Sequence, residues 1–202
     1  MDLKKFSWIR NPKDYTICND KITITTNPNT DLWQKTYYHF INDNAPMLLT
    51  ETQEKFFSFT VKTEFSDSKV RFDQCGIIVY LNSENWLKAS AEYENTAFSH
   101  LGSVVTTNGY SDWATTEIST DIKTIWYRLS RREDDFCIEY SLDGVIFHQM
   151  RICHLLLAKD TISFGIYACS PENSSFTATF TNFNFGECVW KAHNGEQPNM
   201  IN

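Results

Sequence analysis

The stretch NSENWLKASAEYEN, residues 82–95, alternates its side chains in the way that a half-buried β-strand does. One side of the expected strand carries an indole, an ammonium, a hydroxyl and a carboxylate, from Trp86, Lys88, Ser90 and Glu92. The other side carries mostly apolar groups, from Leu87, Ala89, Ala91 and Tyr93. We therefore expect the second side to face a core and the first side to line a site.

Similar short runs recur along the chain and are separated by turn residues. They include KITITT, KFFSFTVKTEF, FDQCGIIVYL, LGSVVTT, TIWYRLSR, FCIEYS, TISFGIYACS and FTATFTNFNF. The pair Asp143-Gly144 supplies the positive φ of a tight hairpin, and only RICHLLLAKD (151–160) has a helical character. Because roughly a dozen strands occur without βαβ alternation, we predict an all-β fold, a two-sheet antiparallel jelly-roll sandwich of the concanavalin A-like type. One sheet of such a sandwich commonly curves and has a concave outer face.

The 202 residues suit one large sandwich, which would bury roughly 70% of the surface of its unfolded chain. Fifteen Phe, nine Tyr and six Trp supply the core. Neither a linker nor an internal repeat divides the sequence. We expect a single domain over residues 1–192 and a polar C-terminal tail over residues 193–202.

The charge and hydropathy patterns argue against two classes of partner. The formal net charge is −7 and the lysines and arginines are scattered, so we expect no nucleic-acid binding. No apolar run approaches about 20 residues, and the start MDLKKFSWIRNPKDY lacks the apolar segment of a secretory signal. We therefore expect no membrane association and a cytoplasmic location.

The cysteines and histidines lack metal-binding spacings. The six cysteines include no C-x-x-C pair, and the five histidines form neither H-x-H nor H-E-x-x-H. We expect small buried thiols, no metal and no cofactor.

Candidate ligand-binding residues start from the polar side of the opening stretch, with Trp86, Lys88 and Glu92. The run TIWYRLSR likewise places Trp126 and Arg128 on its non-core side. Indole faces stack on the C–H faces of sugars while charged groups bind hydroxyls, so this combination suits a carbohydrate or another small polar ligand. The alternative is a solvated face with half-exposed indoles and cross-strand ion pairs.

Two further segments, TDLWQKTYYHFINDNAP and NGYSDWATT, add polar and aromatic candidates: Trp33, Asp43, Ser111, Asp112 and Trp113. If the strands of Lys88 and Arg128 were neighbours, these residues and Glu92 would lie within roughly 10 Å. We would then expect Trp86→Ala to abolish binding and to leave the melting temperature nearly unchanged.

The order of five motifs resembles the domain-of-unknown-function family that includes the fungal regulation-of-enolase protein, whose members adopt a concanavalin A-like lectin/glucanase sandwich. The motifs are TDLWQKTYYHFINDNAP, FDQCGIIVYLNSENWLKASAEYE, GSVVTTNGYSDWA, IWYRLSRREDDFCIEYSLDG and GIYACSPENSSF, within residues 27–185. By the family pattern, the positions carried over are Asp31, Trp33, Asp43, Asn44, Asp73, Gln74, Trp86, Lys88, Glu92, Tyr93, Ser111, Asp112, Trp113 and Arg128. The chain departs from the pattern at Ala45, where a glycine commonly follows Asp-Asn, and at Cys75, where alanine is usual.

Three function classes remain open. A non-catalytic carbohydrate-binding protein is favoured by the aromatic and polar strand face. The family's regulatory association implies an interaction module that docks on a metabolic enzyme. A glycoside hydrolase is least favoured, because the acids of EDDFCIE, Glu133, Asp135 and Glu139, fit the glucanase spacing poorly and are typical of a charged turn.

Overall fold

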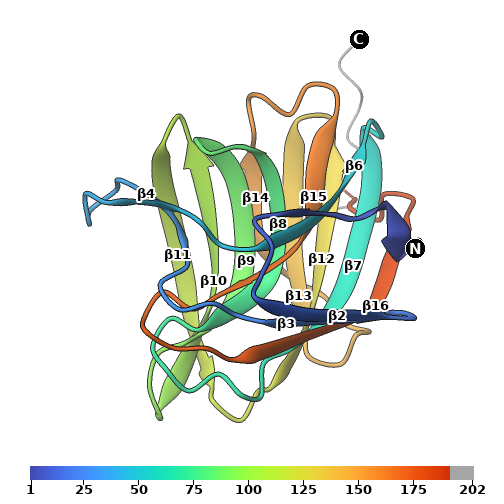
Figure 1. The fold of residues 1–202 in the computed structure, drawn as a ribbon. Helices are drawn as coiled ribbons and strands as arrows, with labels where there is room; N and C mark the ends of the chain where they lie inside the picture. Colours follow the sequence, from blue (N-terminus) through green and yellow to red (C-terminus); the bar gives the residue numbers. More distant parts are fainter. Residues whose placement is uncertain (192–202) are drawn as a thin grey trace.

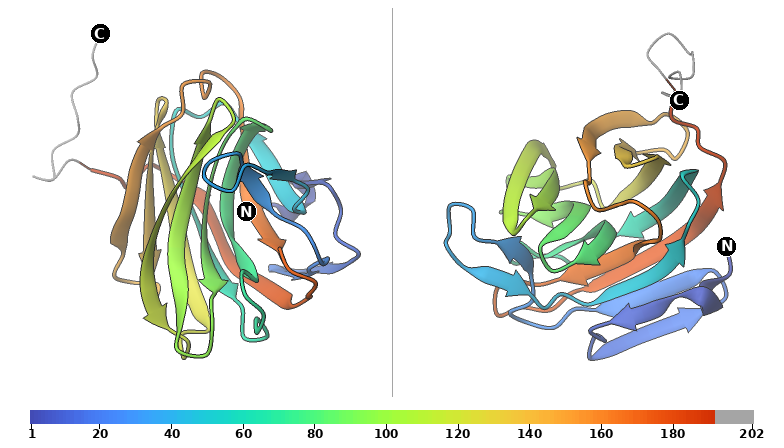
Figure 2. Two further views of the ribbon diagram at one scale, coloured as in Figure 1. Left: turned by 90° about the vertical axis from the view of Figure 1, so that its left-hand side faces the viewer. Right: turned by 90° about the horizontal axis from the view of Figure 1, so that it is seen from above.

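The computed structural model describes residues 1–191 and forms two antiparallel seven-stranded sheets that pack face to face (Figures 1 and 2). Sheet A has the order β1 (Ser7–Ile9), β6 (Met47–Thr52), β15 (Ile162–Cys169), β8 (Gln74–Asn82), β9 (Asn85–Tyr93), β10 (Phe98–Thr107) and β11 (Tyr110–Ser119). Sheet B has the order β14 (His148–His154), β13 (Asp135–Ser141), β12 (Thr124–Arg132), β7 (Phe56–Glu64), β16 (Thr177–Gly186), β3 (Lys21–Thr25) and β2 (Asp14–Cys18). The predicted all-β sandwich is confirmed. The tail over residues 193–202 lies outside the described residues.

Two small elements complete the described chain: the 3-10 helix η1 (Leu3–Lys5), and a hairpin of β4 (Leu32–Gln34) and β5 (Ile41–Asp43). The helical expectation for residues 151–160 is wrong. Arg151 and Cys153 belong to β14, where they pair with Ile138 and Phe136 of β13. Pairing with β13 therefore makes residues 151–154 a strand, and residues 155–160 form a turn-containing connection. No helix within residues 1–191 is long and apolar enough to cross a membrane.

The main core lies between the sheets and confirms the predicted faces of β9. Leu87, Ala89 and Ala91 are buried there, against Phe59 and Leu129 of sheet B among others. The same alternation holds in β12, whose Tyr127 and Leu129 point inward. Burial of these alternate apolar residues holds the two sheets together.

The expected neighbourhood of Lys88, Glu92 and Arg128 is wrong. β9 pairs with β8 and β10 in sheet A, whereas β12, which carries Arg128, pairs with β7 and β13 in sheet B. Since each strand turns its polar side away from the shared core, these residues lie on opposite outer faces of the sandwich.

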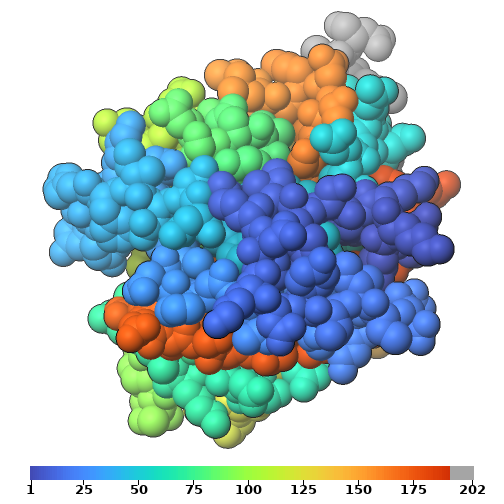
Figure 3. Space-filling model, viewed as in Figure 1, coloured from blue at the N-terminus to red at the C-terminus, as the bar shows by residue number. Residues whose placement is uncertain are grey.

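A second, smaller core lies on the outer face of sheet A, beneath the β4–β5 hairpin. Leu32 and Trp33 of the hairpin pack there with Met47, Ile78 and Trp86. Figure 1 shows the hairpin in front of β10 and β11, and the N-terminal part of the chain, blue in Figure 3, runs across the middle of the same view. The backbone N–H of Gln34 donates to Ser111 Oγ at 3.0 Å, which ties the hairpin to β11.

Trp86 is fully buried in this second core, and its indole N–H donates to the Ser83 carbonyl. The expectation that Trp86→Ala would leave the melting temperature nearly unchanged therefore disagrees with the packing. The strand pattern correctly placed this indole on the outer face, but a distant hairpin covers that face.

Two local expectations have mixed outcomes. Gly144 has φ +76° in the hairpin between β13 and β14, as predicted from Asp143-Gly144. All six cysteines are free; three are buried, Cys153 and Cys188 are half-buried and Cys18 is exposed, so the expectation of small buried thiols holds for half of them. Within residues 1–191, no cluster of three or more His, Cys, Asp or Glu side chains could hold a metal ion.

Candidate functional site

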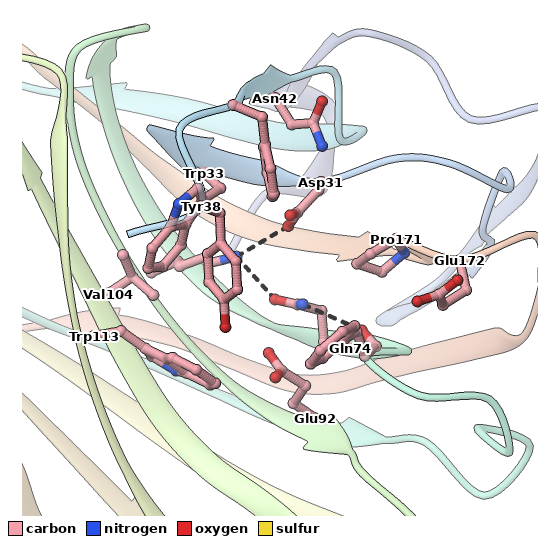
Figure 4. Close-up of a pocket in the computed structure, with 13 residues that line it drawn as sticks. Asp31, Trp33, Tyr38, Asn42, Gln74, Glu92, Val104, Trp113, Pro171 and Glu172 are labelled. Atoms are coloured by element: carbon pink, nitrogen blue, oxygen red, sulfur yellow. Dashed lines mark hydrogen bonds and ion pairs between the residues drawn. The ribbon is translucent and has the colours of Figure 1, made fainter. Parts of the chain in front are cut away.

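A pocket of about 350 Å³ opens on the outer face of sheet A (Figure 4). Its floor comes from β8, β9 and β10, and its other walls come from the β4–β5 hairpin, β11 and the loop after β15. In Figure 4, Trp33 and Tyr38 stand on one side, and Pro171 and Glu172 stand on the opposite side. The pocket therefore has a sheet floor and loop-built walls.

Strand register explains why the floor is hollow. One row across the sheet contains Gln74, Glu92 and His100, and another contains Ile78, Lys88, Val104 and Trp113. The row between them contains the small residues Gly76, Ser90 and Gly102. A Cβ added to Gly102 would lie 3.2 Å from Trp113 Nε1, so this glycine leaves the space that the indole needs.

The polar part of the floor is a connected network. Lys88 Nζ donates to Gln74 Oε1 at 2.9 Å and lies 3.5 Å from Asp31 Oδ1. The hydroxyl of Tyr167 donates to the same Gln74 oxygen at 2.9 Å. The backbone N–H of Leu32 donates to Asp31 Oδ1 at 2.7 Å. Lys88 is 3% exposed, so this network compensates a buried ammonium.

Glu92 differs from the other floor residues because its carboxyl has no hydrogen bond or ion pair within residues 1–191, although only 8% of the residue is exposed. The pKa of Glu92 is raised to about 8, chiefly by burial; Lys88 and Arg71 lower it, whereas Asp31 and Glu94 add to the rise. At neutral pH the group is therefore mostly a neutral acid. Figure 4 shows its carboxyl directed toward the space near Tyr38, Gln74 and Trp113.

Aromatic rings form the upper walls. Trp33 contacts Trp113 edge to face with ring centroids 6.2 Å apart, and also contacts Tyr38 edge to face at 5.5 Å. Tyr38 in turn stacks on Phe40. Trp113 and Tyr38 remain 37% and 46% exposed, so both rings have surface available to a ligand.

Two wall segments have unusual backbone conformations. Lys35, Tyr37 and His39, in the turn between β4 and β5, have φ between +53° and +62°. Phe72 has φ +68°, and its ring lies in the pocket wall beneath the guanidinium of Arg71, whose Cζ is 4.4 Å from the ring centroid. Left-handed backbone in non-glycine residues is energetically unfavourable and clusters at ligand sites. These conformations set the positions of the aromatic walls.

The structure brings together half of the predicted ligand-binding residues, namely Trp33, Gln74, Lys88, Glu92 and Trp113. The others have different surroundings. Trp86 and Ser111 are buried, and Ser111 shares a hydrogen bond with Thr106. Asp43 pairs with Arg10 at 2.9 Å and accepts a hydrogen bond from Tyr80.

The last two predicted residues lie in ion pairs away from the floor. Asp112 pairs with Arg151 at 2.7 Å, and Arg128 binds Glu139 through two nitrogens, at 2.6 and 2.8 Å. Glu139 belongs to sheet B, and Asp135, on the same strand, pairs with His154. The acids of EDDFCIE therefore do not line the pocket.

Residue-by-residue reasoning missed several wall residues that come from loops: Tyr38, Phe40, Asn42, Phe72, Pro171 and Glu172. It also missed the row of small residues that hollows the floor. Glycine within the runs FDQCGIIVYL and LGSVVTT was the available signal, since glycine inside a strand often marks a close approach by another group.

The two packed antiparallel sheets form a sandwich of the concanavalin A-like fold. Two solved structures of low identity share the fold. A GH43 protein from Bacillus licheniformis has a TM-score of 0.71 and 19% identity over 91% of this chain and 37% of its own. A legume lectin-like domain from Entamoeba histolytica has a TM-score of 0.62 and 7% identity over 92% and 91%.

The chain belongs to the family described as "Protein of unknown function (DUF1349)", whose profile matches residues 8–188. It is similar to regulation of enolase protein 1 of Saccharomyces cerevisiae, with 29% identity over 191 residues, which are 95% of this chain and 94% of that protein. A crystal structure of a functionally unknown protein from Saccharomyces cerevisiae superposes with a TM-score of 0.86 and 28% identity, over 94% of this chain and 100% of the other. The resemblance seen in the five ordered motifs is thereby confirmed.

Proposed function

We propose that this protein binds the terminal unit of a saccharide in the pocket on the outer face of sheet A. The observation that carries the proposal is that partly exposed rings, of Trp113 and Tyr38, stand beside a buried floor of polar groups, from Gln74, Lys88 and Glu92. A sugar has apolar C–H faces and a rim of hydroxyls, so it needs both kinds of surface at once.

The floor supplies fixed hydrogen-bonding groups. Gln74 donates one amide N–H to the Phe72 carbonyl at 3.2 Å, and its side-chain oxygen is held by Lys88 and Tyr167. The second amide N–H of Gln74 and the protonated carboxyl of Glu92 are available to hydroxyls. Because the network holds the Gln74 amide before a ligand arrives, little of its side-chain entropy is lost on binding.

The walls favour the end of a chain over its middle. Trp33 and Tyr38 stand on one side of the pocket, with Pro171 and Glu172 opposite (Figure 4). A terminal sugar fits between these walls, and the rest of an oligosaccharide would leave through the open side. The names of the lectin-like and GH43 structural neighbours are in keeping with a carbohydrate ligand, although their low identities establish only the shared fold.

A regulatory interaction with a metabolic enzyme is a second candidate, suggested by the name of the yeast relative. The observation in its favour is a group of exposed apolar side chains on the β4–β5 turn and the start of β11. Tyr37 is 80% exposed, Ile41 57% and Tyr110 61%. Exposed apolar groups of this kind commonly mark protein contacts.

Isothermal titration calorimetry with xylo-, cello-, manno- and chito-oligosaccharides would test the first candidate. We expect saturable binding that is lost in Trp113→Ala and retained in Arg128→Ala, whose residue lies on the opposite outer face. Binding that survives Trp113→Ala would place the ligand elsewhere. A flat response to every saccharide would reject the proposal and favour the protein partner, to be tested with a Tyr37→Ser and Ile41→Ser double variant.

A further inference from the structure

We propose that the saccharide carries a protonated amine, and that Glu92 is the counter-ion for this amine. The inference rests on the proposed saccharide site and specifies its ligand as an amino sugar. It comes from the ionisable groups around the cavity, among which Glu92 has no basic partner within the described residues.

The pocket wall contains three carboxyl groups, from Asp31, Glu92 and Glu172, and one amine, from Lys88. The ammonium of Lys88 is already bound to Gln74 and Asp31. No positive charge in the wall is therefore left for Glu92. An anionic sugar, such as a uronic acid or a sugar phosphate, would meet Glu92 and Glu172 in a wall whose one amine is already bound, whereas a cationic group could pair with Glu92 once this acid has lost its proton.

Glu92 is the specific group that such a cation would meet. Its residue is 8% exposed, its carboxyl faces the cavity, and it has no hydrogen bond or ion pair within residues 1–191. Buried carboxyl groups in proteins are normally paired or hydrogen-bonded, and an unpaired one needs an explanation. A ligand ammonium in the adjoining space would supply the missing partner.

The aromatic walls suit the same ligand. Trp113 and Tyr38 border the space toward which Glu92 points (Figure 4). An ammonium group is attracted to the faces of aromatic rings, and this attraction adds to the ion pair with a carboxylate. A carboxylate surrounded by rings therefore favours an amine over a hydroxyl at this position.

Binding of an amine would be coupled to the loss of a proton from Glu92. The groups around Glu92 are Lys88 on its own strand, Gln74 on β8, His100 on β10, Asp31 above, and the Glu94–Arg71 pair at the end of β9. In these surroundings Glu92 is protonated at pH 6, since its pKa is about 8. An arriving ammonium would lower that pKa, and the proton of Glu92 would pass to the solvent. Binding of a neutral sugar would leave this proton on Glu92.

Calorimetry at pH 6, in two buffers of different ionisation enthalpy, tests this inference. The ligands are glucosamine disaccharides and trisaccharides, their N-acetylated counterparts, and cello-oligosaccharides of the same length. We expect the amine forms to bind at least about tenfold tighter than the N-acetylated forms and to release close to one proton per site. Both the preference for the amine forms and the proton release should vanish in Glu92→Gln.

Equal affinity for amine and N-acetylated ligands, or tighter amine binding without proton release, would overturn the inference and leave the saccharide site standing. Absence of binding by every sugar would reject both proposals together. Proton release is measured on the unaltered protein, so the test does not depend on the folding of a variant. Glu172→Gln, at the rim opposite Tyr38, should reduce the amine preference less than Glu92→Gln does.

Discussion

Lys88 and Glu92 project from the same face of β9, yet the ammonium of Lys88 is bound to Gln74 at 2.9 Å and to Asp31 at 3.5 Å instead of to Glu92. The protein thus supplies partners for the charge of Lys88, whereas the carboxyl of Glu92 faces the cavity. The pocket therefore combines a hydrogen-bonded polar floor with the buried carboxyl of Glu92, which has no hydrogen bond or ion pair within residues 1–191.

Replacing Glu92 by Gln should change how stability depends on pH. The folded pKa, about 8, lies above the ordinary value of 4.5, so between these values the unfolded chain binds fewer protons than the folded one. Stability due to this group is complete below pH 4.5 and is lost as the pH rises toward 8, at about 1.4 kcal/mol per pH unit. Glu92→Gln should have the same melting temperature as the unaltered protein near pH 5 and a higher one at pH 8.

Glu117→Gln, at an exposed position of β11, is the control, and its melting temperature should not depart from that of the unaltered protein in this way. The prediction would be contradicted if the melting temperatures of Glu92→Gln and of the unaltered protein changed with pH in the same way between pH 5 and pH 8.

The two outer-face indoles of sheet A should respond differently to truncation. Trp86 is fully enclosed, so Trp86→Ala should cost about 3–5 kcal/mol of unfolding free energy. Trp113 is 37% exposed, so Trp113→Ala should cost far less, about 1 kcal/mol, while it removes saccharide binding. Urea denaturation measures both. Similar losses of stability in the two variants would show that Trp113 is also a core residue.

Adding one methyl group at Gly102 should narrow the pocket. Its Cβ would lie 3.0 Å from Thr115 Cγ2, 3.1 Å from the Ala114 carbonyl oxygen and 3.2 Å from the Trp113 indole nitrogen. Gly102→Ala should therefore displace the indole, weaken ligand binding, and cost roughly 1–2 kcal/mol.

The control is Gly186→Ala, because a Cβ at Gly186 meets nothing within 4 Å. It should leave both binding and stability within about 0.5 kcal/mol of the unaltered protein. If Gly102→Ala bound ligand equally well, the row of small residues would not form the binding surface.

Removing the buried ammonium should be costly. Lys88→Met leaves Asp31 and Gln74 without their shared partner in a buried network, so we expect a loss of about 3 kcal/mol or more and a loss of ligand binding. Lys159→Met removes an ammonium whose side chain is 62% exposed and which pairs with Asp134, so its cost should stay below about 1 kcal/mol. Thermal melting of the two variants at one pH compares them directly, and equal costs would mean that Lys88 is well hydrated.

The local alternation of side chains was enough to predict which sides of β9 and β12 meet the main core. In β9, the alternation of Leu87, Ala89 and Ala91 with Lys88 and Glu92 is local information, because successive side chains of a strand point to opposite faces. The pattern therefore predicted the sandwich and the outward polar face of this strand. The five ordered motifs predicted the family.

Which outward residues lie together depends on sheet order and on the segments that cover the sheet. Sheet order places β9 beside β8 and β10, so Glu92 lies opposite Gln74, and Arg128 lies on the other sheet. Folding of the β4–β5 hairpin over sheet A buries Trp86 and leaves Trp113 at the pocket. Strand order and loop coverage arise from packing between segments distant in the chain, and such packing leaves no periodic signal in either segment.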